Sequence, residues 1–174
     1  GGFYRLSREE ILAIVENLFI GNRLEKGLVK LGAHCEIDLK QIRNPLVIFA
    51  SHGDNITPPH QALGWIPAVY ETTKALIAAD QRIVYLINQH AGHLGIFVSA
   101  SVARLEHRAM LENLSDIEAL EPGLYEMRID NPTGDPDCDH DQYIVRFEPR
   151  RVEDLVFETQ PEAFERVGRL FFFF

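Results

Sequence analysis

The amino-acid sequence predicts an α/β fold in which helices flank a parallel sheet. Two short apolar runs, Pro45–Ala50 and Arg82–Ile87, have the length and composition of strands that are buried on both faces. The segment between them carries a helical pattern, and a strand–helix–strand unit pairs its two strands in parallel. Further along the chain, two runs alternate between apolar and polar residues and predict a hairpin.

An amphipathic helix is predicted near the start of the chain. Glu10 follows Ser7 by three residues, which is the pattern of a capping box at a helix N-terminus. Apolar residues then recur at helical spacing, namely Ile11, Leu12, Ile14, Val15, Leu18 and Phe19. Gly21 is a suitable helix stop. Residues 22–44 are mixed in character and contain one short apolar segment, Ile37–Leu39.

Further helices are predicted after each apolar run. Residues 61–80 have a helical pattern, and Pro67 places the start of the helix proper near residue 66, because proline favours a first turn. Residues 95–114 carry apolar residues at helical spacing. Residues 160–170 predict a short terminal helix.

The pattern changes at about residue 121. Tyr125–Ile129 and Tyr143–Phe147 alternate with period two, as the strands of a hairpin do. The connecting loop, 130–142, holds proline, glycine and five aspartates. We therefore divide the chain into residues 1–120 and a hairpin and tail appendage, 121–174.

Composition and charge restrict the class of protein. The 174 residues, 46% hydrophobic and 25% charged, suit one globular domain. The net charge of −9 argues against a nucleic-acid partner, which needs clustered lysine and arginine. Two cysteines, Cys35 and Cys138, suit a reducing, cytoplasmic compartment. No apolar run approaches the ~18 residues of a membrane span. The Gly-Gly start and the run Phe171–Phe174 suggest a piece of a longer protein.

Two polar residues stand where chemistry is expected in a parallel sheet. Asp54 and His93 each follow a predicted strand by a few residues, so both should lie at the edge formed by the strand carboxyl ends. An aspartate that orients a histidine is the supporting half of a nucleophile–His–Asp triad. The alternative is purely structural, with Asp54 capping a turn and His93 capping a helix.

Four segments resemble the polyhydroxyalkanoate synthase-like branch of the α/β-hydrolase superfamily: Glu16–Leu24, Ile37–Pro45, Ala50–Pro59 and Gly92–Gly95. The resemblance implies that residues 1–120 are the C-terminal part of an α/β-hydrolase-like catalytic domain. It also implies that Asp54 is the triad acid and His93 the triad base of a bacterial acyltransferase. Its substrates would be acyl thioesters or esters. The resemblance implies no metal and no organic cofactor, since a coenzyme A thioester would be a substrate.

The nucleophile of such a triad is missing from the sequence. There is no Gly-x-Ser-x-Gly or Gly-x-Cys-x-Gly elbow, and Cys35 is flanked at two residues' distance by Ala33 and Ile37. In the family the nucleophile lies earlier in the chain. We therefore expect the 174 residues alone to be inactive, and to self-associate or contact a missing N-terminal half. An esterase or depolymerase of the same fold, or a non-catalytic scaffold, remain alternatives.

Metal sites have weaker support in the sequence. His90 lies three residues before His93, and His52 lies beside Asp54, but hydrolytic zinc needs three convergent ligands. His52 and His90 are alternatively lining residues of an acyl pocket, or simply polar loop residues. The aspartates of loop 130–142 do not follow the calcium-loop pattern.

Overall fold

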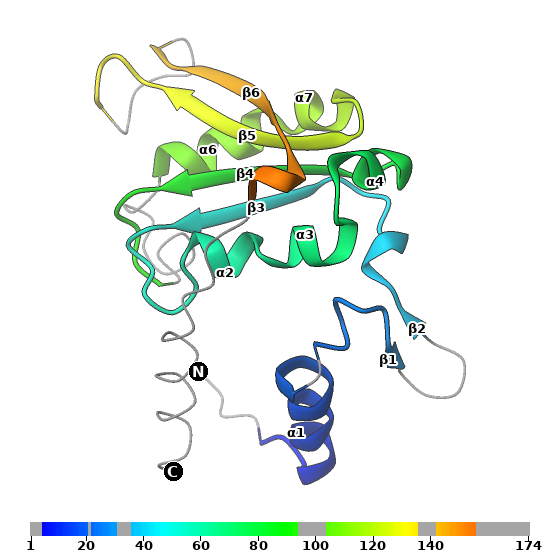
Figure 1. Ribbon diagram of the computed structural model, residues 1–174. Helices are drawn as coiled ribbons and strands as arrows, with labels where there is room; N and C mark the ends of the chain where they lie inside the picture. Colours follow the sequence, from blue (N-terminus) through cyan, green and yellow to red (C-terminus); the bar gives the residue numbers. More distant parts are fainter. Residues whose placement is uncertain (1–4, 21, 31–35, 94–103, 136–141, 156–174) are drawn as a thin grey trace.

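The computed structural model describes residues 5–20, 22–30, 36–93, 104–135 and 142–155. They form a mixed α/β structure around a four-stranded sheet with the order β3-β4-β5-β6 (Figure 1). The strands are β3 (Leu46–Ser51), β4 (Arg82–Asn88), β5 (Gly123–Asp130) and β6 (Ile144–Arg150). The first three are parallel and β6 is antiparallel to β5. The predicted parallel α/β sheet with flanking helices is therefore present.

Short helices cover the two faces of this sheet. On one face lie α2 (Pro59–Leu63), α3 (Trp65–Tyr70) and α4 (Thr73–Ala78), and on the other lie α6 (Arg104–Glu112) and α7 (Leu114–Ala119) (Figure 1). Successive residues of β4 point to opposite faces, so Ile83 and Tyr85 pack in the first core and Val84 and Leu86 in the second. This explains why β4 is apolar along almost its whole length.

The two predicted buried strands differ in their actual burial. Four consecutive residues of β4, Ile83–Leu86, are buried, as predicted. In β3 only the last two residues are buried, and Val47 is 38% exposed. The prediction of burial on both faces was wrong for β3, because β3 is the outermost strand of the sheet and has a neighbour on one side only within the described residues.

The predicted helix over 61–80 is three short helices. Glu71 ends α3 with a φ of 56°, a left-handed conformation that no α-helix can continue. The side chain of Thr72 then accepts a hydrogen bond from the backbone N–H of Ala75 and begins α4. Pro67 lies in the first turns of α3, close to the predicted start.

The capping box at the chain start is confirmed. The Ser7 hydroxyl accepts from the Glu10 N–H at 3.2 Å, and the Glu10 carboxylate accepts from the Ser7 N–H at 2.6 Å. They open α1 (Arg8–Ile14), which continues as a π-helix over Val15–Ile20. Helix α1 buries none of its residues and lies apart from the sheet (Figure 1).

Small elements that the sequence did not predict follow α1. The strands β1 (Val29–Lys30) and β2 (Glu36–Ile37) form an antiparallel pair. Leu39–Gln41 and, late in the chain, Val152–Leu155 form 3₁₀ turns.

The predicted hairpin is confirmed, but it is not an appendage. Strands β5 and β6 pair antiparallel from Leu124–Arg150 to Asp130–Ile144. Strand β5 also pairs in parallel with β4, so the sheet runs on across the predicted division at residues 120 and 121. Buried Leu124 and Met127 on opposite faces of β5 join the two cores. Period-two alternation identified the strands but held no information about this neighbour.

The structure describes only part of the remaining predicted elements. Helix α6 confirms the segment 95–114 from Arg104 onward, while residues 94–103 and the predicted helix 160–170 lie outside the described residues. None of the helices in the described ranges combines the length and apolar character needed to cross a membrane.

Candidate functional site

Two loops meet at the carboxyl ends of β3 and β4. The His52 N–H, just after β3, donates to the backbone carbonyl of Asn88 at the end of β4, at 3.0 Å. Gly53 comes so close to the next loop that a Cβ there would lie 2.5 Å from the carbonyl oxygen of His90. Only glycine allows this approach of two backbones. The two loops are therefore held together at a point directly before Asp54.

Asn88 stabilises the second loop from within. Its Oδ1 accepts hydrogen bonds from the backbone N–H groups of His90 and Ala91, both at 2.7 Å. Its Nδ2 donates to the carboxylate of Glu106 on α6. Helix α6 is in this way connected to the turn that precedes His93.

Asp54 and His93 lie in direct contact across the two loops. Nδ1 of His93 is 3.0 Å from Oδ2 and 3.2 Å from Oδ1 of Asp54. The two residues thus meet at the edge of the sheet where the sequence predicted them. Asp54 is buried, with 8% of its surface exposed, whereas the His93 side chain is 35% exposed. The pair thus joins a buried carboxylate to an imidazole that solvent can reach.

The surroundings of Asp54 favour its anionic form. Burial alone raises the pKa of the carboxyl group, but several hydrogen bonds outweigh burial and hold the pKa well below its ordinary value. The Thr57 hydroxyl donates to Oδ2 at 2.7 Å and the Thr57 N–H to Oδ1 at 2.9 Å, while His93 and the Ile56 N–H contribute further bonds. Asp54 is therefore a carboxylate at neutral pH.

An anionic Asp54 determines which nitrogen of His93 carries the proton. The carboxylate can only accept, so it favours the tautomer with hydrogen on Nδ1. The Thr57 hydroxyl, 3.4 Å from the same nitrogen, lies beside this contact. In the described part of the chain every hydrogen bond of the His93 ring uses Nδ1. Nε2 is left as a proton acceptor, which is the arrangement of a general base.

A cavity of about 400 Å³ lies at the carboxyl ends of β4 and β5, on the same edge of the sheet as the pair. Its lining is part apolar and part polar, and consists of His52, Leu86, Ile87, Gln89, Leu105, Glu106, Glu126, Met127, Arg128 and Ile129. The volume falls within the ~300–1,000 Å³ of small-molecule sites. Of the two histidines suggested as lining residues of an acyl pocket, His52 is in the lining of this cavity and His90 is not.

The other residues considered in the sequence have less defined places. His90 takes part through its backbone N–H and carbonyl. Cys35 and Cys138 lie outside the described residues. Across the ranges that the structure describes, no three histidine, cysteine or acidic side chains come together as metal ligands.

Sequence reasoning missed four residues that build the site: Gly53, Thr57, Asn88 and Glu106. Thr57 had a detectable signal, because a hydroxyl residue three positions after an aspartate suits a side-chain-stabilised turn. Asn88 had a signal as well, because an asparagine at a strand end often accepts hydrogen bonds from the backbone of the turn that follows. Gly53 and Glu106 act through contacts between distant segments, for which the sequence carries no local signal.

Comparison with known proteins adds a relative and a family. A Rhizobium meliloti protein described as "Uncharacterized protein in ackA 5'region" is 44% identical over 159 residues, which cover 89% of this chain and 22% of that protein. The chain thus spans about a fifth of the length of this curated relative. No solved structure matches the chain. The model of the family "Protein of unknown function (DUF3141)" matches residues 1–170, and the chain belongs to that family.

Proposed function

We propose that Asp54 and His93 are the acid and base of a nucleophile–His–Asp triad for acyl transfer from thioesters or esters. The observation that carries the proposal is the 3.0 Å contact between Nδ1 of His93 and Oδ2 of Asp54. It joins a carboxylate kept anionic to an imidazole whose second nitrogen is available. The nucleophile, a cysteine or serine, comes from outside these 174 residues.

The placement of the pair adds support. Both residues follow neighbouring parallel strands at their carboxyl ends, where open α/β sheets collect functional groups. In α/β-hydrolases the acid precedes the histidine in the chain, and that order holds here. The α/β-hydrolase sheet and the polyhydroxyalkanoate synthase-like branch are the parts of the proposal that come from sequence resemblance.

The chemistry follows from the two nitrogens of His93. Nε2 takes the proton of the nucleophile, whose sulfur or oxygen forms a bond to the acyl carbon while the bond to the thiol or alcohol leaving group breaks. His93 then protonates that leaving group. In the second half, His93 deprotonates an incoming hydroxyl or water, which takes the acyl group and frees the nucleophile. Asp54 holds the tautomer and stabilises the imidazolium in both halves.

The test uses the natural polypeptide that contains these residues, assayed with acyl-coenzyme A thioesters and p-nitrophenyl esters. We expect His93→Gln to lower kcat by about 10³-fold or more, and Asp54→Asn to lower it by a comparable factor. His90→Gln is the matched control and should retain activity, since His90 contributes through its backbone. Full activity of His93→Gln would refute the proposal.

The 174-residue chain provides a second arm of this test. It should show no thioesterase activity above background, because base and nucleophile act as a unit. If the chain is active and Cys35→Ala abolishes the activity, Cys35 is the nucleophile and the proposed division of the triad is wrong.

A further inference from the structure

The cavity lies where the pairing between β4 and β5 ends. Residues Arg82–Tyr85 of β4 pair with Gly123–Glu126 of β5, but both strands continue beyond the last pair. Beyond this last pair, β4 stays paired with β3 and β5 with β6, and residues from both strand ends line the cavity together with Leu105 and Glu106 of α6. A crevice at the carboxyl ends of parallel strands is the usual ligand position in such sheets.

Most charges around this cavity cancel one another. Arg150 contacts Glu126 at 2.7 Å and Glu148 at 2.5 Å. Arg128 reaches the same two carboxylates, at 3.2 Å each. Two guanidinium groups and two carboxylates therefore form a neutral network on the β5–β6 side. An anionic ligand would have to compete with two carboxylates for Arg128.

Glu106 is the charge that this network leaves uncompensated. It is half-buried in the opposite wall, and its hydrogen-bond partner is the neutral amide of Asn88. Among the described residues no cation pairs with its carboxylate. One Asn88 donor leaves most of the acceptor capacity of a carboxylate unused. The cavity thus combines an apolar floor with one net negative charge.

We propose that this cavity binds a small amphipathic organic cation, with an ammonium group on Glu106 and an apolar chain against Leu86, Leu105 and Met127. A charge-assisted hydrogen bond between ammonium and carboxylate gives orientation, and the apolar lining gives burial. The net charge of −9 favours the approach of a cation. The proposal is independent of the acyl chemistry of Asp54 and His93, which are outside the lining.

Three probes with the same apolar chain isolate the role of the headgroup: hexylammonium, hexanol and hexanoate. Binding to the natural polypeptide that contains these residues is followed by NMR shifts of the methyl groups of Leu86, Met127 and Ile129. We expect hexylammonium to bind at least about tenfold more tightly than hexanoate, with hexanol between them. Equal binding of hexanoate, or shifts away from these methyl groups, would overturn the proposal.

Substitutions then test the carboxylate itself. Glu106→Gln preserves an acceptor for Asn88 and should weaken hexylammonium binding about tenfold while leaving hexanol unchanged. Glu118→Gln on α7 removes the same charge from an exposed position outside the lining and is the matched control. An equal loss in both variants would show general electrostatic attraction and contradict the assigned site.

A third variant tests whether the probes occupy the cavity itself, without changing Glu106. Ile129→Trp places bulk at a half-buried lining position and should abolish binding of both hexylammonium and hexanol. Asp54→Asn should leave hexylammonium binding unchanged, so that failure of this site and failure of the acyl-transfer proposal give different results. Retained binding in Ile129→Trp would place the probe elsewhere.

Discussion

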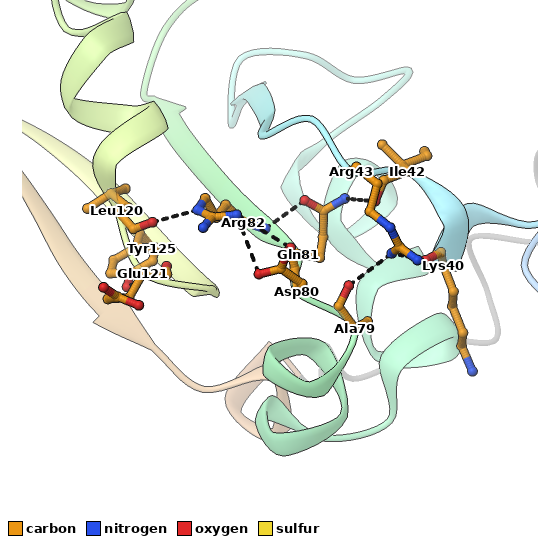
Figure 2. Close-up of polar contacts among 10 residues, drawn as sticks. All are labelled: Lys40, Ile42, Arg43, Ala79, Asp80, Gln81, Arg82, Leu120, Glu121 and Tyr125. Atoms are coloured by element: carbon orange, nitrogen blue, oxygen red, sulfur yellow. Dashed lines mark hydrogen bonds and ion pairs between the residues drawn. The ribbon is translucent and has the colours of Figure 1, made fainter.

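The two edges of the parallel sheet use their polar side chains in different ways. At the amino edge, donors bind backbone carbonyls: Gln81 binds Ile42 at 3.0 Å, Arg43 binds Ala79 at 3.1 Å, and Arg82 binds Leu120 at 2.5 Å (Figure 2). At the carboxyl edge, side chains accept from backbone N–H groups and also bind one another, as His93 binds Asp54 and Asn88 binds Glu106.

This difference separates structural from chemical roles. A side chain that satisfies a backbone carbonyl fixes one segment against another and has little left for a ligand. Gln81, with 0% exposure, uses its oxygen for the Arg82 N–H and its nitrogen for Ile42. At the carboxyl edge Nε2 of His93 and part of the Glu106 carboxylate are not used in this way. Function is therefore expected at the second edge.

The largest effect is expected at the amino edge, from Gln81→Leu. The substitution leaves the carbonyl of Ile42 without its Gln81 partner and removes an acceptor from the Arg82 N–H. We expect the free energy of unfolding to fall by about 3 kcal/mol, measured by urea denaturation. Gln89→Leu, the same exchange at an exposed position of the other edge, should change it by less than about 0.5 kcal/mol. Equal losses of unfolding free energy in the two variants would show that the two edges do not differ in this way.

Gly53→Ala tests the contact between the two loops. A methyl group cannot fit 2.5 Å from a carbonyl oxygen, so one loop must move, at a cost of about 2 kcal/mol. Gly92→Ala is the control, because a Cβ at Gly92 has no neighbour within 4 Å among the atoms the structure describes. The movement should also separate Asp54 from His93, which the NMR signal of the Nδ1 proton of His93 reports. An unchanged signal would show that the contact does not position the pair.

Asp54→Asn should alter stability only where Asp54 is ionised. The folded-state pKa lies below the unfolded value of ~3.9, so the contribution of the carboxylate is complete above that value. It is lost as the pH falls through the lower, folded-state pKa. At pH 7 the variant should be less stable by about 1.5 kcal/mol. The difference should shrink progressively below about pH 4, as thermal melts across pH would show.

The smallest effect on folding is expected from Val47→Lys on the edge strand β3. An edge strand with an exposed apolar residue favours association, and we expect the chain to self-associate at micromolar concentration. A lysine at this position should shift the chain toward monomer in sedimentation measurements. Ile144 on the opposite edge strand, β6, is exposed as well, so Ile144→Lys tests whether association uses both edges or the β3 edge alone. A wild-type monomer with a cooperative melt would show that the β3 edge is already covered.

The sequence was informative about the sheet and about the pair at its edge. Apolar runs and helical periodicity are local signals, and two parallel strands necessarily bring their carboxyl ends together. That geometry was enough to predict that Asp54 and His93 meet. It was not enough to show that β5 continues the sheet beside β4, since period two does not identify a strand's neighbour.

The parts that could not be predicted depend on close approach in space. The hydrogen bond between Asn88 and Glu106 joins a strand end to a helix, and burial of β3 depends on its position in the strand order. The helical pattern breaks at Glu71 because its backbone adopts a left-handed conformation, although glutamate has no special preference for turns. Such features follow from tertiary packing, which overrides local propensity.

The approach of Gly53 to His90 also limits how this loop can vary through evolution. Surface loops usually accept changes of length and composition. Here one position has no space for even a methyl group, while a Cβ at Gly92 in the second loop meets none of the described atoms within 4 Å. In a homologue with any larger residue at position 53, the backbone of the second loop, around position 90, must follow a different path. In such a homologue, the distance between the aspartate and the histidine has to be established anew rather than transferred by alignment.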